Sequence, residues 1–274
     1  NAGLEISQIQ VEPESWYEEN QVYQILGKKI ISVDKTEKEV TLEDGMRLKY
    51  TKLIYALGAK SFVPPIPGSE KEQVAVIRTL EDAEKIGQMI PKNGQTVVIG
   101  GGVLGLEAAW ELKKAGCQVT VLEVAPVLMG RQLDEGAAAM LGSIAESVGI
   151  KVRTEGQERV TAVRLADGEE IAANLVLISC GVRANTELAE QMGLKVNRAV
   201  AVNEKMQTSE KDIYACGDCV EFEGENAALW AEASEQGKVA GANAAGECVE
   251  YQKVQMPLSF NGMNTSLYAI GDNG

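Results

Sequence analysis

The sequence predicts an α/β fold built from two related units, of which the second is complete and is inserted in the first. Three observations predict this fold: an internal repeat, a run that reads as strand, glycine turn, helix and strand, and an ordinary globular composition. Apolar residues make up 45% of the 274 residues and charged residues make up 24%. Such a chain is long enough for two medium-sized domains.

The repeat relates residues 40–59 to residues 163–182 at a constant offset of 123 positions. Each copy reads as a strand, a tight Asp-Gly turn, a second strand and then a short buried strand. The two turns are Asp44–Gly45 and Asp167–Gly168. Two unrelated hairpins that look alike are one explanation, and two homologous nucleotide-binding units are the other.

The buried strand of each copy ends at a glycine, Gly58 in the first copy and Gly181 in the second. This shared ending favours two homologous units, and we predict that both glycines contribute to cofactor binding. The second unit then needs a phosphate-binding glycine loop ahead of its hairpin, and such a loop begins at Gly100. The same offset places the loop of the first unit before Asn1, so we expect the first unit to be incomplete.

The glycine loop lies within a complete pattern of elements. An apolar β-branched run, Gln95–Ile99, precedes the loop, and a helical pattern from Leu106 to Ala115 follows it. A second apolar strand then ends at Glu123. This order is typical of a Rossmann-like dinucleotide-binding unit, in which a diphosphate lies at the N-terminus of the helix.

The three glycines of this motif have different expected roles. Gly100 permits a tight turn, Gly102 lets the backbone approach a diphosphate, and Gly105 lets the helix pack closely on the strand. Val103 and Leu104 come next to Gly102, where unpaired N–H groups and the helix dipole favour negative charge. We therefore predict that these five residues bind the diphosphate.

Two acidic residues extend the predicted site. Glu123 follows the loop at the spacing expected of a carboxylate that accepts a hydrogen bond from a ribose 2′-hydroxyl, and its charge repels a 2′-phosphate. We therefore expect NADH rather than NADPH as the ligand. Glu107 lies inside the helix and has two interpretations: an ordinary exposed glutamate, or a residue that faces the nicotinamide end of the cofactor.

Charge and composition exclude several classes of function. The chain has 26 basic and 40 acidic residues and a formal charge of −14, which repels polyphosphate, so we expect no nucleic-acid partner. No apolar run approaches the roughly 18 residues of a membrane span. The five cysteines, an odd number, fit reduced thiols in a cytoplasmic protein. Histidine is absent, and we predict neither a metal site nor a catalytic side chain.

A second candidate site follows the strand-like run 212–218, which ends in a Gly-Asp corner at Asp218. A helical pattern from about 228 to 245 comes after it. A carboxylate at the end of a strand and ahead of a helix is well placed to bind a polyol such as a ribityl chain. A commonplace turn is the alternative interpretation.

Three segments together resemble the pyridine nucleotide–disulfide oxidoreductase-like flavoproteins, which carry two dinucleotide-binding domains. They are residues 53–59, the loop 100–105 and residues 208–218, with Leu57 in place of the family's usual threonine. Within this family the resemblance is closest to the flavoprotein portion of NAD(P)H nitrite reductase large subunits and to NADH:rubredoxin reductases. The segments that suggest it are residues 16–20, 62–68, 131–134 and 184–189.

The resemblance implies two cofactors, NADH and FAD, and a hydride transfer from NADH to the flavin. Electrons then leave to an acceptor such as nitrite-reductase centres or rubredoxin. It also implies that Asp218 binds the ribityl or pyrophosphate region of the flavin, and this role disfavours a redox dithiol between Cys216 and Cys219. The family's first glycine-rich motif is absent, so we expect this chain to bind NADH with little FAD retention and little turnover.

The resemblance also implies domain boundaries. The two parts of an FAD domain are expected at residues 1–73 and 206–257, the NAD domain at 74–205, and the start of a truncated C-terminal domain at 258–274. The partners left open are an electron-acceptor protein or domain and a second copy of the chain. Two alternative functions remain: a non-catalytic nucleotide-binding module and a flavin-free NAD-dependent dehydrogenase.

Overall fold

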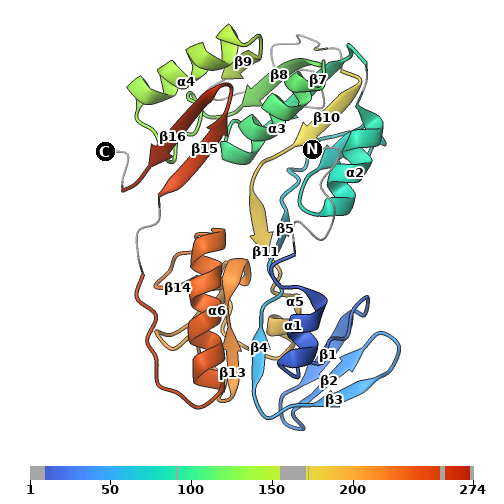
Figure 1. Cartoon of the computed structure of the whole chain (residues 1–274), viewed down its shortest axis with the longest axis vertical. Helices are drawn as coiled ribbons and strands as arrows, with labels where there is room; N and C mark the ends of the chain where they lie inside the picture. The colour runs from blue at the N-terminus through green and yellow to red at the C-terminus, as the bar shows by residue number, and fades with distance from the viewer. Residues whose placement is uncertain (1–9, 91, 155–170, 172, 254–256, 272–274) are drawn as a thin grey trace.

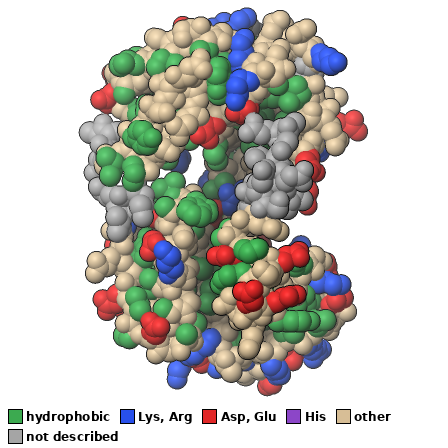
Figure 2. Space-filling view, viewed as in Figure 1, with side chains coloured by type: hydrophobic (Ala, Val, Ile, Leu, Met, Phe, Trp, Pro, Cys, Tyr) green, Lys and Arg blue, Asp and Glu red, His purple; other side chains and the backbone are tan. Residues whose placement is uncertain are grey.

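The computed structural model describes residues 10–90, 92–154, 171, 173–253 and 257–271. The described residues form two bodies that meet at a narrow waist (Figure 1). We call the body that contains the glycine loop the upper body and the other one the lower body. The space-filling view is hollowed at the waist between them (Figure 2).

A sheet of five parallel strands forms the centre of the upper body. Its strands, in spatial order, are β6 (Val74–Val76), β10 (Leu175–Ile178), β7 (Gln95–Ile99), β8 (Gln118–Glu123) and β9 (Lys151–Thr154). The chain runs outward from β7 to β9 and then returns to β10 on the other side of β7. The predicted α/β class is confirmed for this body, which has a parallel sheet with accompanying helices.

The strands form where the sequence has β-branched runs. In β7 the last four residues are buried, which is typical of a central strand covered on both faces. Three helices accompany the sheet, namely α2 (Leu80–Met89), α3 (Val103–Lys114) and α4 (Glu135–Ser147). The side chain of Thr79 accepts from Asp82 N at 3.1 Å, and Asp82 accepts from Thr79 N at 2.9 Å, so α2 begins with a capping box.

The helix of the glycine motif begins earlier than the pattern predicts. The apolar periodicity indicates a start at Leu106, whereas α3 begins at Val103 with Gly102 as its N-cap. Gly102 has φ −80° and ψ 179°, the extended conformation of an N-cap residue. The first turn of the helix is therefore part of the glycine motif itself, and Gly105 lies inside the helix.

The lower body consists of small sheets and short helices. It contains α1 (Glu14–Glu19), β1 (Ile30–Asp34), β2 (Glu39–Leu42), β3 (Arg47–Lys49), β4 (Leu53–Tyr55), α5 (Glu187–Gln191), β12 (Val200–Val202), β13 (Ile213–Ala215), β14 (Val220–Phe222) and α6 (Trp230–Ala244). The strands β1, β2 and β3 form an antiparallel meander, and β4 pairs in parallel with β13. The expected Asp44–Gly45 hairpin is present, with φ +86° at Gly45. Its counterpart at Asp167–Gly168 lies outside the described residues.

Two short strands connect the bodies. The strands β5 (Ala59–Ser61) and β11 (Val182–Ala184) pair as an antiparallel ribbon at the waist (Figure 1). Each begins directly after one of the repeated glycines, Gly58 or Gly181, and both glycines have positive φ. The two copies of the repeat therefore meet at this ribbon.

The packing differs from the expected domain boundaries at two points. The segment from α5 to β12 was expected in the NAD domain, but β12 pairs with β14 and the segment shares its core with Tyr55 and Ile213 of the lower body. The hairpin of β15 (Leu258–Gly262) and β16 (Thr265–Ala269) was expected to begin a separate domain. Its residues Phe260 and Met263 are instead buried in the core around α3. Apolar burial thus extends the upper body beyond residue 258.

The described residues contain no helix that is long and apolar enough to cross a membrane.

Candidate functional site

The glycine loop lies at the point where the strand order of the upper sheet reverses. The strands β7 and β10 are parallel neighbours, so their carboxyl ends lie side by side. Ser179, the first residue after β10, donates its N–H to the carbonyl of Ile99 at 2.8 Å. In open α/β sheets a ligand binds in the crevice outside the carboxyl ends of the strands at this reversal.

The first glycine of the loop is required by close packing. Gly100 has φ +116°, which residues with a side chain rarely adopt. A Cβ atom at this position would lie 2.2 Å from the carbonyl oxygen of Ser179. Gly100 therefore lets the loop turn tightly against the end of β10.

Gly105 and Gly102, the other two glycines of the motif, differ in how closely protein atoms surround them. A Cβ atom at Gly105 would lie 2.0 Å from the carbonyl oxygen of Gly100, so helix α3 packs directly on the loop. A Cβ atom at Gly102 would meet no heavy atom within 4 Å. The space that a diphosphate would need is thus open at Gly102 and closed at Gly105. Contact with a ligand stays a prediction for both.

The N-terminus of α3 faces this open space without a side-chain cap. Val103 packs partly against the core, and the side chain of Leu104 is 59% exposed. Lys113 and Lys114 lie in the last turn, where they complement the helix dipole. The exposed backbone N–H groups at the beginning of α3 can therefore bind an anion.

Glu123 points toward the glycine loop. Its Oε2 atom accepts from the N–H of Gly101 at 2.6 Å, and its Oε1 atom accepts from the N–H of Ala125 at 2.8 Å. The side chain is half-buried at the end of β8. Each carboxylate oxygen can accept a further hydrogen bond, so the group is placed for a ribose hydroxyl beside the loop.

The structure bears on one of the two interpretations of Glu107, that of an ordinary exposed glutamate. The residue is half-buried, and burial raises the pKa of its carboxyl, while the backbone N–H of Asn261 lowers it. Its side chain is therefore not an ordinary exposed glutamate, because it contacts the β15 strand. The nicotinamide contact stays a prediction.

Gly58 and Asp218, which are predicted to bind a cofactor, lie at the ends of paired strands in the lower body. Gly58 follows β4 with φ +62°, and Asp218 lies in a 3₁₀ turn, Gly217–Cys219, that follows β13. Because β4 and β13 are parallel neighbours, both residues lie at the same edge. Gly181 connects this region to the upper body, since its carbonyl accepts from the N–H of Phe62 at 2.8 Å.

Arg78 is a site residue that sequence reasoning missed. Its Nη2 atom lies 2.5 Å from Oδ2 of Asp218, whose side chain is 15% exposed. The same Nη2 atom would lie 3.8 Å from a Cβ atom at Gly58. Arg78 follows β6 of the upper body, so the fold brings a cation to the predicted flavin residues from 140 positions away. No sequence motif around Arg78 predicts its contact with Asp218.

The thiols of Cys216 and Cys219 are free and buried. Each packs in a different core cluster, Cys216 with Met206 and Cys219 with Tyr55. Burial raises the pKa of Cys216 to about 11, so its thiol stays protonated at neutral pH. Disulfide exchange needs a thiolate, and this geometry agrees with the sequence-based preference for Asp218 as the functional residue of the corner.

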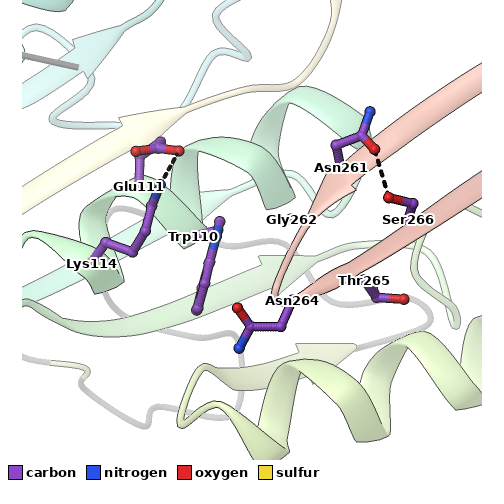
Figure 3. A pocket seen from close by; sticks show the side chains of 8 residues that line it. All are labelled: Trp110, Glu111, Lys114, Asn261, Gly262, Asn264, Thr265 and Ser266. Atoms are coloured by element: carbon purple, nitrogen blue, oxygen red, sulfur yellow. Dashed lines mark hydrogen bonds and ion pairs between the residues drawn. The ribbon is translucent and has the colours of Figure 1, made fainter.

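A separate cavity of about 370 Å³ lies between α3 and the β15–β16 hairpin (Figure 3). Four of its polar side chains form two pairs: Lys114 with Glu111 at 2.7 Å, and Ser266 with Asn261 at 2.8 Å. The residues that line it include none of those predicted to bind a cofactor. The cavity is therefore distinct from the dinucleotide site.

Residues 4–237 match the model of the pyridine nucleotide-disulphide oxidoreductase family. The chain is 32% identical over 267 residues to the NADH-rubredoxin oxidoreductase of Clostridium acetobutylicum, a match that covers 97% of this chain and 68% of that protein. It is also 36% identical over 277 residues to a nitrite reductase [NAD(P)H] of Bacillus subtilis, covering 98% of this chain and 34% of that protein.

Solved structures agree with these relatives. A ferredoxin reductase from Rhodopseudomonas palustris superimposes with a TM-score of 0.90 at 25% identity, covering 98% of this chain and 69% of that one. The crystal structure of the C. acetobutylicum NADH:rubredoxin oxidoreductase gives a TM-score of 0.82 at 32% identity, covering 92% and 65%.

The solved structures agree with the α/β fold of the chain, and the family model and the relatives define its class. The chain belongs to the pyridine nucleotide-disulphide oxidoreductase family. The predicted cofactor pair, NADH and FAD, is confirmed at the level of the family. The chain spans about a third of the length of several curated relatives, at 33%, 34% and 32%.

Proposed function

We propose that this chain is the NADH-handling part of a flavoprotein oxidoreductase. Such an enzyme transfers a hydride from NADH to FAD and then passes electrons to an acceptor. The observation that carries the proposal is the open space at Gly102, which lies at the reversal point of the sheet beside a carboxylate aimed at the loop. The family relationship supports the same reaction.

The residues of the chain would act by binding and orientation. The N–H groups at the start of α3 would hold the diphosphate of NADH, and Glu123 would accept from the adenosine ribose. Placing the nicotinamide against the flavin lowers the entropic part of the barrier. The chemistry that bound FAD supplies is the acceptance of a hydride and the release of electrons singly or in pairs.

The residues at the end of β4 and β13 fit a flavin. Asp218 is a carboxylate at a strand end, and Arg78 supplies a guanidinium beside it, as a ribityl hydroxyl and a phosphate would require. Gly58 leaves room next to both. Asp218 would accept from ribityl hydroxyls, and Arg78 would donate to a phosphate oxygen.

The preference for NADH follows from Glu123. A 2′-phosphate placed next to this carboxylate would meet a like charge at hydrogen-bond distance, which costs free energy even with solvent screening. We expect the chain to bind NADH at least about tenfold more tightly than NADPH.

Titration of the purified chain with NADH and NADPH tests the proposal. We expect saturable NADH binding, seen as a change in NADH fluorescence, and reduction of added FAD by NADH in the complete gene product. Absence of NADH binding would remove the proposed function. NADH binding by a complete gene product that never holds flavin would favour a flavin-free dehydrogenase or a non-catalytic nucleotide-binding module.

The relatives suggest the class of acceptor. Their names include a rubredoxin oxidoreductase and nitrite reductases, so we propose a protein-borne redox centre as the acceptor. NADH-dependent reduction of rubredoxin by the complete gene product, compared with reduction of ferricyanide, tests this assignment. A homodimer and a cytoplasmic location stay predictions, and light scattering and cell fractionation measure them.

A further inference from the structure

The middle residue of the glycine loop, Gly101, is fixed at each of its backbone groups. Its N–H donates to Oε2 of Glu123 at 2.6 Å, and its carbonyl accepts from the N–H of Met129 at 3.0 Å. A Cβ atom at Gly101 would lie 2.6 Å from Cδ2 of Leu128 and 3.0 Å from Cβ of Glu123. The loop is therefore held by Glu123, the last residue of β8, and by residues that follow this strand.

The segment that holds Gly101 is residues 124–133, which we call the strap. Its side chains at Leu128 and Met129 are 2% and 3% exposed and belong to the core of the upper body. The carbonyl of Met129 accepts from the N–H groups of Gln132 and Leu133 at 2.8 and 3.0 Å. Met129 has φ +50°, an uncommon conformation for a residue with a side chain. The surrounding contacts hold the strap in this shape.

The strap determines which N–H groups can reach a diphosphate. The N–H of Gly100 donates to the carbonyl of Leu122 at 2.8 Å, and that of Gly101 donates to Glu123. Both are engaged within the protein. The donors to an anion must therefore come from Gly102 and the first turn of α3, and their direction depends on how Gly101 is held.

We propose that the strap is a positioning device for the dinucleotide, and that Glu123 acts on binding through Gly101 in addition to any contact with ribose. The proposal rests on the proposed function and deepens it. Glu123 joins the end of β8 to the loop, Leu128 closes the side of Gly101, and the N–H of Met129 fixes its carbonyl. Without these contacts, the N–H groups of Gly102 and the first turn of α3 would no longer all point toward the diphosphate.

A double-mutant cycle, in which Glu123 is changed in the protein and the ribose hydroxyls are removed from the ligand, separates two roles of Glu123. One role is the contact with ribose, and the other is the contact with Gly101. In Glu123→Gln one of the two N–H groups, of Gly101 or of Ala125, would face an amide NH₂ and lose its acceptor. The probes are NADH and an NADH analogue that lacks both hydroxyls of the adenosine ribose. We expect the variant to bind the analogue about tenfold more weakly than the wild type does, a factor that corresponds to about 1.4 kcal/mol. Equal binding of the analogue by both proteins would overturn the proposal.

A matched pair of core variants tests the strap directly. Leu128 and Leu141 are both almost fully buried in the same core, at 2% and 1% exposure, but Leu128 alone contacts Gly101. We expect Leu128→Ala and Leu141→Ala to lower the melting temperature similarly, and only Leu128→Ala to raise the dissociation constant of NADH. Equal dissociation constants in the two variants would count against the strap.

The outcomes distinguish this proposal from the proposed function. If the wild-type chain fails to bind NADH, the function itself fails, and hydrogen exchange of residues 124–133 in the ligand-free Glu123→Gln variant still reports on the strap. We expect faster exchange there than in the wild type, because the loop and the strap are coupled by Glu123. If hydrogen exchange and the binding of NADH and its analogue are all unchanged in the variant, the proposed function is retained and the positioning role of the strap is rejected.

Discussion

At the scale of single residues, the positions of the glycine loop differ in why each one requires glycine. Gly100 and Gly105 are required by contacts with protein backbone, whereas the space at Gly102 is open. Spacing alone predicts these three roles, because the motif ties each glycine to a local contact. The structure agrees with the packing predicted for Gly100 and Gly105, and the diphosphate contact at Gly102 stays a prediction.

Gly102→Asp tests the open space. The new side chain meets no protein atom at its Cβ, so the fold should tolerate it, but its charge would occupy the place of the diphosphate. We expect the dissociation constant of NADH to rise about a hundredfold or more. Fluorescence titration measures this change. Gly142→Asp, in α4 with equally open surroundings, is the control and should leave binding unchanged. A Gly102→Asp protein that binds like the wild type contradicts the site.

Glu107 gives a pH-dependent prediction. Burial raises the pKa of its carboxyl above 4.5, the value of an exposed glutamate, so the folded state favours the protonated form. This contribution to stability is present below pH 4.5 and is lost as the pH rises through the folded pKa. Glu107→Gln should therefore melt at a higher temperature than the wild type at pH 7.

Melting curves at pH 4 and pH 7 measure this difference. The advantage of Glu107→Gln should shrink at pH 4, where the wild-type carboxyl is increasingly protonated. Glu146→Gln, an exposed position near the end of α4, serves as the comparison. A Glu107→Gln variant that is no more stable than the wild type at pH 7 would show that Asn261 holds the charged form more strongly than burial disfavours it.

At the scale of elements, local sequence patterns account for β7 and α2. Both depend on neighbours in the sequence, a β-branched run for β7 and a capping box for α2. The contact between Arg78 and Asp218 could not be predicted in this way, because 140 residues separate the partners and only the tertiary fold joins them. The packing of the β15–β16 hairpin on α3 escaped prediction for the same reason.

Phe260→Ala tests whether the hairpin is part of the upper body. Phe260 is fully buried in the core around α3, and its truncation should cost about 3–5 kcal/mol of unfolding free energy. Tyr268→Ala, at a side chain 71% exposed on the same hairpin, should change stability little. Urea unfolding of the two variants measures the contrast. Similar stabilities would indicate that the hairpin is not part of the cooperative core.

At the scale of the whole molecule, the glycine loop lies in the upper body and Asp218 lies in the lower body, so we expect the two predicted cofactor sites to respond separately to mutation at these positions. Asp218→Asn removes the charge that pairs with Arg78 and the proposed acceptor of ribityl hydroxyls. In the complete gene product we expect flavin affinity to fall at least about tenfold and the dissociation constant of NADH to stay unchanged. Equilibrium dialysis with each cofactor checks this. Equal losses for both cofactors would contradict the assignment of Asp218 to the flavin.

The ribbon of β5 and β11 constrains how the two bodies can move. Its strands are hydrogen-bonded to each other, and each is further tied at its end, since Asn185 donates its N–H to Gly58 and Phe62 donates its N–H to Gly181. Paired strands resist sliding along their length but bend across it. We therefore expect the two bodies to tilt about the ribbon more easily than they slide past each other along it, because sliding breaks the hydrogen bonds between β5 and β11.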